Sequence, residues 1–174
     1  MQGFELAYTQ SDEATFMLWD FRELDTQPWF GYEVNKLVSI TAATFTAHFH
    51  QYWYGFLEKG YNTTKLPVFD ARAFNVPYDD WPNVFIWRQR DWERNSVQML
   101  ARSLYSQKKL HGKPVSELKE LCSLLDKDWD KQSDHLKYGT FIDARYSHLS
   151  TRLSYDDYKL IEAHTEKNRD RTSR

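Results

Sequence analysis

The feature that most limits the fold of this chain is a pair of alternating apolar and polar runs, separated by a short polar break. The apolar positions of the two runs are Phe4, Leu6, Tyr8, Ala14, Phe16 and Leu18. Period-two alternation on both sides of a polar stretch predicts a β-hairpin, here spanning about residues 3–20. Asp12 and Glu13 then lie at or just after its tip.

Asp12 occupies the kind of position at which a nucleotide-polymerising palm holds its divalent metal. Mg²⁺ takes oxygen ligands and shares them with substrate phosphates, so a carboxylate on a rigid hairpin suits it. Asp and Ser are also ordinary turn residues. When the hairpin is taken alone, a polar turn with no chemistry is the simpler interpretation.

Composition limits the class of protein. The 174 residues suffice for one domain, or one domain with a tail, and 17% aromatic residues can build a substantial core. A net charge of −2 gives no global basic signature, so contact with nucleic acid requires a local patch. The single cysteine, Cys122, excludes an intrachain disulfide framework and a thiolate cluster for zinc. Neither a signal peptide nor a membrane-length apolar run is visible, and we therefore expect a cytoplasmic protein.

Two long helices and another strand are predicted after the hairpin. A 3.6-residue apolar period predicts a helix over about 33–56. Asn35 and Lys36 lie near its positive N-terminal end, where a phosphate is favoured. Residues 66–76 have the pattern of a strand, and the second long helix is predicted from about Tyr78 or Pro82 to Gln107.

The rest of the chain predicts shorter elements. These are a helix from about Pro114 to Leu125, a short edge strand within 137–142, a last helix over about 155–164 and a charged tail over 166–174.

On the second long helix, a polar sector lies opposite the main apolar stripe. The stripe consists of Ile86, Val97, Leu100 and Leu104. At 100° per residue, Arg88, Asp91 and Asn95 fall in a similar sector on the other side. This separation fits a functional face, and it also fits a solvated face with an i,i+3 ion pair. The solvated face is the simpler interpretation from spacing alone.

Four segments, in this order, resemble the tRNA(His) guanylyltransferase superfamily of 3′–5′ polymerases. They are Tyr8-Thr9-Gln10-Ser11-Asp12-Glu13, Asn35-Lys36-Leu37-Val38-Ser39, Phe69-Asp70-Ala71-Arg72 and Trp87-Arg88-Gln89-Arg90-Asp91-Trp92-Glu93-Arg94-Asn95. The segments at 106–113 and 137–139 also fit, so the resemblance covers about residues 3–142. Each segment alone is weak, whereas their order and spacing together are specific.

The resemblance implies an α+β fold with a palm-like (ferredoxin-like) antiparallel sheet packed by long helices. It implies a palm-like nucleotidyltransferase domain over residues 1–149 and a C-terminal helix with a charged tail over residues 150–174. It also implies two Mg²⁺ ions, GTP and ATP as substrates, and nucleotide addition to the activated 5′ end of tRNA.

Roles follow from the resemblance residue by residue. Asp12 is implied to be a metal-ligating catalytic carboxylate, with Glu13 as its catalytic neighbour. The positions implied to bind the nucleotide, its phosphates or the activated 5′ end are Ser11, Lys36, Arg72, Arg88, Asp91, Asn95 and Lys113.

Two departures from the family pattern qualify this expectation. The family's first strand carries an Arg-x-Asp-Gly motif that this sequence lacks, so we expect the first strand and helix of the palm, and part of the two-metal site, to be missing. In addition, Glu93-Arg94-Asn95-Ser96 stands where the eukaryotic motif has a histidine and paired asparagines. This resembles the bacterial, archaeal and viral "like" branch, associated with templated repair of truncated tRNA 5′ ends.

The expected function is therefore a tRNA 5′-end nucleotidyltransferase that adds or repairs nucleotides in the 3′–5′ direction. The alternatives are a truncated, non-catalytic member that binds RNA or nucleotide, and one half of a split enzyme. The expected partners are tRNA, nucleoside triphosphates, and a second copy or another chain that supplies the missing segment, with no membrane.

Overall fold

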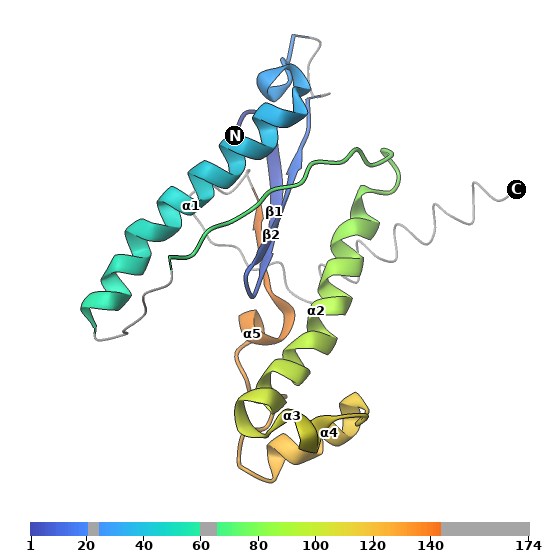
Figure 1. The fold of residues 1–174 in the computed structure, drawn as a ribbon. Helices are drawn as coiled ribbons and strands as arrows, with labels where there is room; N and C mark the ends of the chain where they lie inside the picture. The colour runs from blue at the N-terminus through green and yellow to red at the C-terminus, as the bar shows by residue number, and fades with distance from the viewer. Residues whose placement is uncertain (21–24, 60–65, 144–174) are drawn as a thin grey trace, which may run out of the picture. The chain divides into compact units, whose positions relative to one another are not determined.

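The computed structural model describes residues 1–20, 25–59 and 66–143 (Figure 1). These residues form two compact units. The α1 unit contains residues 1–3 and 19–75, and the sheet unit contains residues 4–18 and the chain from Val76 onward. The last predicted helix and the charged tail lie outside the described residues.

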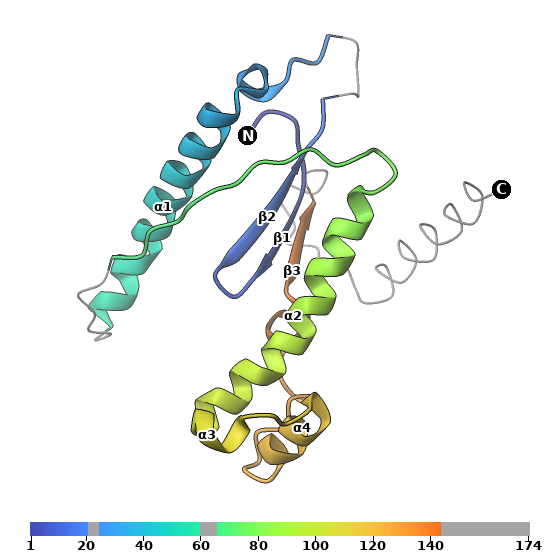
Figure 2. The same ribbon diagram turned by 45° about the vertical axis from the view of Figure 1, so that its right-hand side comes forward.

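The sheet unit is built on a three-stranded antiparallel sheet with the order β2-β1-β3. The predicted hairpin is confirmed as β1 (Phe4–Gln10) and β2 (Glu13–Leu18). β3 (Thr140–Asp143) pairs with the other edge of β1, so segments far apart in the sequence lie side by side (Figure 2). Within the described residues β3 is an edge strand, so the edge strand predicted over 137–142 is confirmed for residues 140–142, whereas residues 137 and 138 end α5.

The second predicted long helix is α2 (Trp81–Leu104), and its first half covers the sheet. Leu6 and Tyr8 of β1, Phe85 and Ile86 of α2 and Phe141 of β3 form one buried cluster. Period-two alternation puts Leu6 and Tyr8 on the same face of β1, and that face meets the apolar stripe of α2. The mixed α+β architecture expected from the sequence is therefore confirmed.

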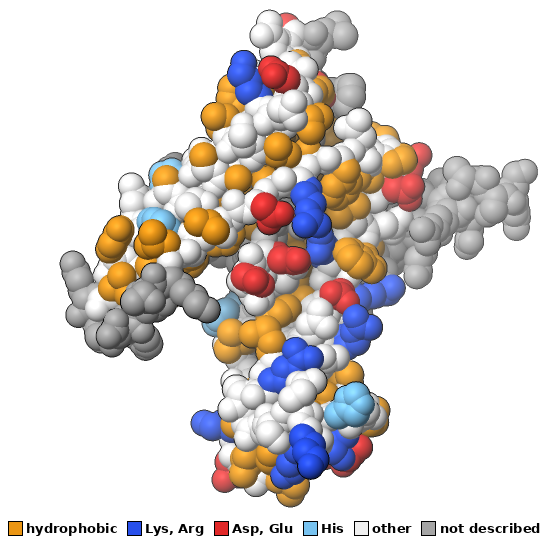
Figure 3. Space-filling model, in the orientation of Figure 1, with side chains coloured by type: hydrophobic (Ala, Val, Ile, Leu, Met, Phe, Trp, Pro, Cys, Tyr) orange, Lys and Arg blue, Asp and Glu red, His pale blue; other side chains and the backbone are white. Residues whose placement is uncertain are grey.

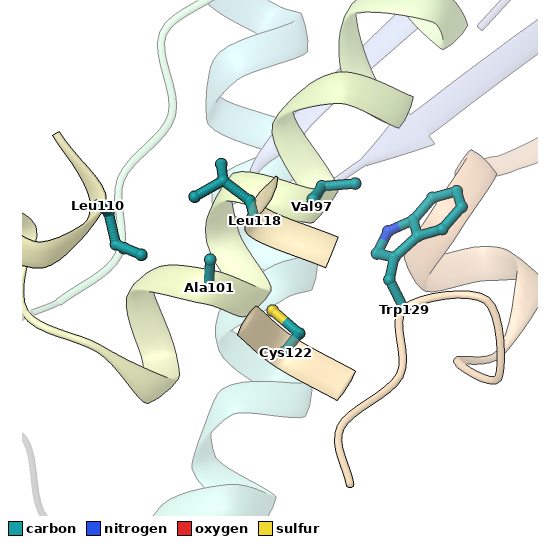
Figure 4. Packing of buried hydrophobic residues seen from close by; sticks show 6 residues of the cluster. All are labelled: Val97, Ala101, Leu110, Leu118, Cys122 and Trp129. Carbon is teal, nitrogen blue, oxygen red and sulfur yellow. The ribbon is translucent and has the colours of Figure 1, made fainter. Parts of the chain in front are cut away.

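The second half of α2 packs on a small helical layer. This layer consists of α3 (Gln107–Leu110), α4 (Val115–Ser123) and α5 (Asp134–Tyr138), and it confirms the helix predicted near 114–125. In Figure 4, Leu118 and Cys122 of α4 lie against Val97 and Ala101 of α2, with Trp129 beside them. Cys122 is fully buried, and this burial raises the pKa of its thiol.

The α1 unit contains a short 3-10 helix, η1 (Trp29–Tyr32), and α1 (Val34–Glu58), which confirms the first long helix. The strand predicted at 66–76 is wrong, because this segment is extended but belongs to no sheet of the described residues. Its backbone is held by α1 side chains: Thr46 Oγ1 accepts from the Phe69 amide at 3.1 Å, and His50 Nε2 lies 2.6 Å from the Pro67 carbonyl. The Phe69 ring packs edge-on against Phe45 of α1, with 4.7 Å between ring centroids. An extended segment that packs on a helix has the same alternating pattern as a strand.

No helix among residues 1–20, 25–59 and 66–143 is both long and apolar enough to cross a lipid bilayer.

Gly139 gives a test of how tightly the sheet packs on α5. Gly139 has a φ of +75°, and a Cβ placed on it would lie 2.5 Å from the Tyr8 hydroxyl. Gly112 has nearly the same φ, +74°, with nothing within 4 Å of the added Cβ. Both Gly→Ala changes place alanine at a positive φ, but Gly139 also has a ψ of −166°, a combination essentially restricted to glycine, and only Gly139→Ala displaces Tyr8. We expect Gly139→Ala to lower the free energy of unfolding by about 1–3 kcal/mol more than Gly112→Ala, as measured by urea denaturation. Equal losses for the two variants would mean that Tyr8 is not tightly packed.

Candidate functional site

The tip of the hairpin is a two-residue turn. Gln10 and Glu13 are paired across β1 and β2, so Ser11 and Asp12 form the loop between them. Of these two loop residues only Ser11 has a positive φ, 47°. A positive φ at the first central position is common to the tight turns of β-hairpins, and glycine, asparagine or aspartate usually occupies it. Backbone strain at a non-glycine residue occurs often at functional sites, and here it leaves the Asp12 side chain exposed at the tip.

Glu13 fastens the tip to α2. Its Oε2 accepts hydrogen bonds from Arg88 Nη1 at 2.9 Å and from Gln10 Nε2 at 2.9 Å. Arg88 also lies over the ring of Trp87, 5.0 Å from its centroid. One predicted catalytic residue and one predicted binding residue are therefore in direct contact, although 75 positions separate them in the sequence.

Asp91 makes its contacts within α2. Its two carboxylate oxygens accept from Arg94 Nη2 at 2.5 Å and from Asn95 Nδ2 at 2.8 Å. An i,i+3 ion pair is present on this face, as the simpler sequence interpretation requires, but it joins Asp91 to Arg94. Arg88 pairs with Glu13 of the hairpin instead. The polar sector of α2 is therefore a solvated face at Asp91 and Arg94, but it contacts another element at Arg88.

The other predicted binding residues lie elsewhere. Lys113 follows α3 and pairs with Glu117 of α4. In the α1 unit, Lys36 near the start of α1 pairs with Glu33 at 3.7 Å, and Arg72 in the extended segment pairs with Asp70 at 3.4 Å. Among the described residues of its own unit, each of these three cations pairs with a close sequence neighbour and with no other predicted site residue. Their assignment to a common site stays a prediction.

The residues around the tip fit one Mg²⁺ ion better than two. Mg²⁺ keeps several waters and needs only one or two carboxylates when it shares substrate phosphates, and exposed Asp12 satisfies this need. Glu13 is already bonded to two donors. In the part of the chain that the structure describes, no group of three or more His, Cys, Asp or Glu side chains is placed to hold a metal. The two-ion expectation therefore has no complete ligand set among these residues.

Sequence reasoning missed Gln10. Its side chain is buried, and it orients Glu13 from the neighbouring strand. The signal was present, because a two-residue turn at 11–12 makes positions 10 and 13 direct cross-strand partners. The environment of Tyr32 was also unforeseen: burial, and then the hydrogen bond that the phenol donates to the Asp20 carboxylate, raise the pKa of Tyr32 to about 12.

Comparison with known proteins identifies one matching family model and several structures with a similar fold. Residues 1–77 match the family model described as tRNAHis guanylyltransferase. No curated protein sequence matches the chain. A bacterial tRNA(His) guanylyltransferase-like protein in complex with ATP has 31% identity and a TM-score of 0.74 over 83% of this chain and 62% of its own. A bacterial tRNA(His) guanylyltransferase-like protein in complex with GTP has 28% identity and a TM-score of 0.65 over 82% of this chain and 56% of its own.

A more distant structure shares the fold. The tRNA(His) guanylyltransferase of Saccharomyces cerevisiae has 23% identity and a TM-score of 0.65, over 84% of this chain and 72% of its own. Against the two bacterial structures, the chain spans about three fifths of their length.

The contact between Glu13 and Arg88 can be tested by a double-mutant cycle. Because the Glu13 side chain is 57% exposed, we expect a coupling energy of only about 0.2–1 kcal/mol between Glu13→Gln and Arg88→Gln in urea unfolding. The control pair is Glu13→Gln with Arg94→Gln, because Arg94 bonds to Asp91. The assignment is wrong if the Arg88 cycle is additive, or if the control cycle couples as strongly.

Proposed function

We infer from the family model matched by residues 1–77 and from the 31%-identical bacterial structure that the chain is a member of the tRNA(His) guanylyltransferase superfamily. On that premise we propose that it binds a nucleoside triphosphate and takes part in nucleotidyl transfer to the 5′ end of a tRNA. The observation that carries the proposal is the presentation of Asp12 at the hairpin tip, next to the Glu13–Arg88 contact with α2. Support comes from the two bacterial structures, which contain ATP and GTP and align with more than four fifths of this chain.

In this proposal Asp12 is the residue that would hold a Mg²⁺ ion beside the triphosphate. A bound Mg²⁺ supplies positive charge to phosphoryl oxygens. Arg88 and Asn95 donate hydrogen bonds to the nucleotide or to the RNA 5′ end, Ser11 donates through its hydroxyl, and Glu13 and Asp91 hold these donors in place. Lys36, Arg72 and Lys113 neutralise phosphate charge. Catalysis in phosphoryl-type transfer is mainly positioning and electrostatic stabilisation, and this is the work that such residues perform.

The finer proposal concerns direction and substrate. We propose 3′–5′ addition or repair at a tRNA 5′ end in the cytoplasm, with GTP or ATP as the nucleotide source. A second copy or another chain would contribute the ligands for a second Mg²⁺ ion.

A second candidate function is nucleotide or RNA binding without catalysis. The observation that favours it is that the Glu13 carboxylate is engaged by Arg88 and Gln10, so that of the two tip carboxylates Asp12 alone lacks an ion pair among the described residues. Templated addition to a 5′-triphosphorylated tRNA lacking its first base separates the two candidates. Mg²⁺-dependent addition by the purified chain, abolished by Asp12→Asn, supports the enzyme. Binding of the same RNA without addition, also when a segment bearing Arg-x-Asp-Gly is supplied, supports the binding protein.

Asp12→Asn tests whether Asp12 ligates a metal or only forms a turn. The change keeps the turn but removes the charge, so we expect a shift in Tm of less than about 2 °C and at least a tenfold loss of Mg²⁺-dependent ATP affinity. The matched control is Asp126→Asn, at another exposed turn residue of the sheet unit. A large fall in Tm with unchanged ATP affinity, measured by calorimetry with and without Mg²⁺, would support the polar turn instead.

Arg72→Ala tests the phosphate role of the extended segment in the α1 unit. Arg72 is 88% exposed and its one ion pair is local, so its loss should leave Tm nearly unchanged. We expect a three- to tenfold loss of GTP and ATP affinity, on the order of a charge-assisted hydrogen bond. Arg102→Ala is the control, because Arg102 is also exposed but lies outside the predicted site. An equal effect of the two variants would exclude Arg72 from the site.

A further inference from the structure

A cavity of about 430 Å³ lies in the sheet unit between the hairpin tip, the second half of α2 and the segment around α5. Residues lining it include Ser11, Trp92, Met99, Leu100, Trp129 and Leu136. Its volume falls within the range of small-molecule sites, about 300–1,000 Å³. Met99 and Leu136 are each 49% exposed, so the cavity opens to solvent at its rim.

The walls combine flat apolar surface with unsatisfied polar groups. Two indoles, a thioether and two leucines suit a planar ring. Two buried lining side chains, Gln10 and Trp92, each have a polar atom without a hydrogen-bond partner among the described residues, namely Gln10 Oε1 and Trp92 Nε1. Polar side chains that include Gln132 and His135 also line the cavity, so an occupant with donors and acceptors along its edge is favoured over a purely aliphatic one. A nucleobase has both the planar ring and the polar edge.

The cavity lies next to the hairpin tip that presents the Asp12 carboxylate. Ser11 lines the cavity, and Asp12 is the next residue, exposed at the same tip. Among the residues that the structure describes, the Ser11 hydroxyl is engaged by the Met99 sulfur alone, at 3.7 Å. Sulfur is a weak acceptor, so this hydroxyl is readily redirected to a ligand.

We propose that this cavity binds the base of a nucleoside 5′-phosphate whose phosphate group lies at Asp12. The inference rests on the proposed function and adds to it a base-binding subsite. Two sources carry this chemistry, the first nucleoside of a 5′-phosphorylated RNA and a free nucleoside triphosphate. The experiment separates them.

The test compares ligands with and without the base, in the presence of Mg²⁺. One arm uses a short 5′-triphosphorylated RNA and the same RNA with an abasic first nucleotide. The other arm uses ATP and ribose 5′-triphosphate. Base stacking on aromatic walls predicts that the wild-type chain binds the base-containing member of at least one pair about tenfold or more tightly, and that arm identifies the source.

Ser103→Trp is the blocking variant, because Ser103 is exposed at the cavity and its hydroxyl bonds to the Leu100 carbonyl at 2.7 Å. The matched control is Ser123→Trp, at an exposed serine near the end of α4 whose hydroxyl bonds to the Lys119 carbonyl at 3.1 Å. Ser103→Trp should abolish the preference for the base, and Ser123→Trp should keep it. Leu136→Trp, at the rim beside α5, provides a second blocking variant if Ser103→Trp lowers the circular dichroism signal of the fold.

The outcomes separate this inference from the proposed function. Equal affinity for both members of both pairs, with binding intact, overturns the base subsite alone. A preference for the base that survives both blocking variants also overturns it. Failure of the wild-type chain to bind any of the four ligands overturns the base subsite and the proposed function together.

Discussion

The burial of Tyr8 is the interaction on which the sheet unit depends. Its side chain is 0% exposed, its hydroxyl donates to the Tyr138 carbonyl at 2.7 Å, and its ring lies 4.6 Å from that of Phe141. One residue therefore joins the centre of the sheet to β3 and to Tyr138 of α5, which is 130 positions away in the sequence. A buried tyrosine is stable only when its hydroxyl is paired, so these contacts form together. The tip residues Ser11 and Asp12 follow directly after the end of β1, three and four residues beyond Tyr8, so this core supports the tip.

The contact between Glu13 and Arg88 has a different role, because it is worth little in free energy. Both side chains are partly exposed, and such pairs contribute about 0–1 kcal/mol. Its value is geometric: it fixes which part of α2 faces the hairpin, and Gln10 holds the same Glu13 oxygen from the adjacent strand. Acidic and basic side chains are interspersed on the face drawn in Figure 3, which agrees with the net charge of −2. The charge of the candidate site is therefore determined by local acid–base pairs of this kind, and not by a large surface patch of one sign.

Elements with a strong local signal could be predicted from the sequence. The hairpin and the two long helices have period-two and 3.6-residue patterns, and they form within a few residues of the expected bounds. The segment at 66–76 was mistaken for a strand because periodicity records alternation of side chains and not the partners of the backbone. α5 is only five residues long, too short for a periodic pattern.

The candidate site was predictable only in part. The tip position of Asp12 follows from the hairpin pattern, whereas the pairing of Arg88 with Glu13 depends on tertiary packing that no spacing within α2 contains. Local rules favoured an i,i+3 partner for Arg88, and the helix satisfies Asp91 with Arg94 and Asn95 instead. The roles that the resemblance implies for individual residues are harder still to predict. Contacts within the protein show which groups meet, but they do not show which ligand those groups bind.

The charges around the tip suggest why a metal ion should accompany any triphosphate there. Asp12, Glu13 and Asp91 contribute −3 and Arg88 and Arg94 contribute +2, so the described face has a formal charge of −1. A triphosphate carries several negative charges, and like charges at close range repel even near a protein surface. Both arginines are already paired with carboxylates, which reduces what they can offer a free phosphate. Mg²⁺ at Asp12 reverses the sign of the local field. Nucleotide affinity at this face is therefore expected to depend on the ion, whereas a bare phosphate site would be indifferent to it.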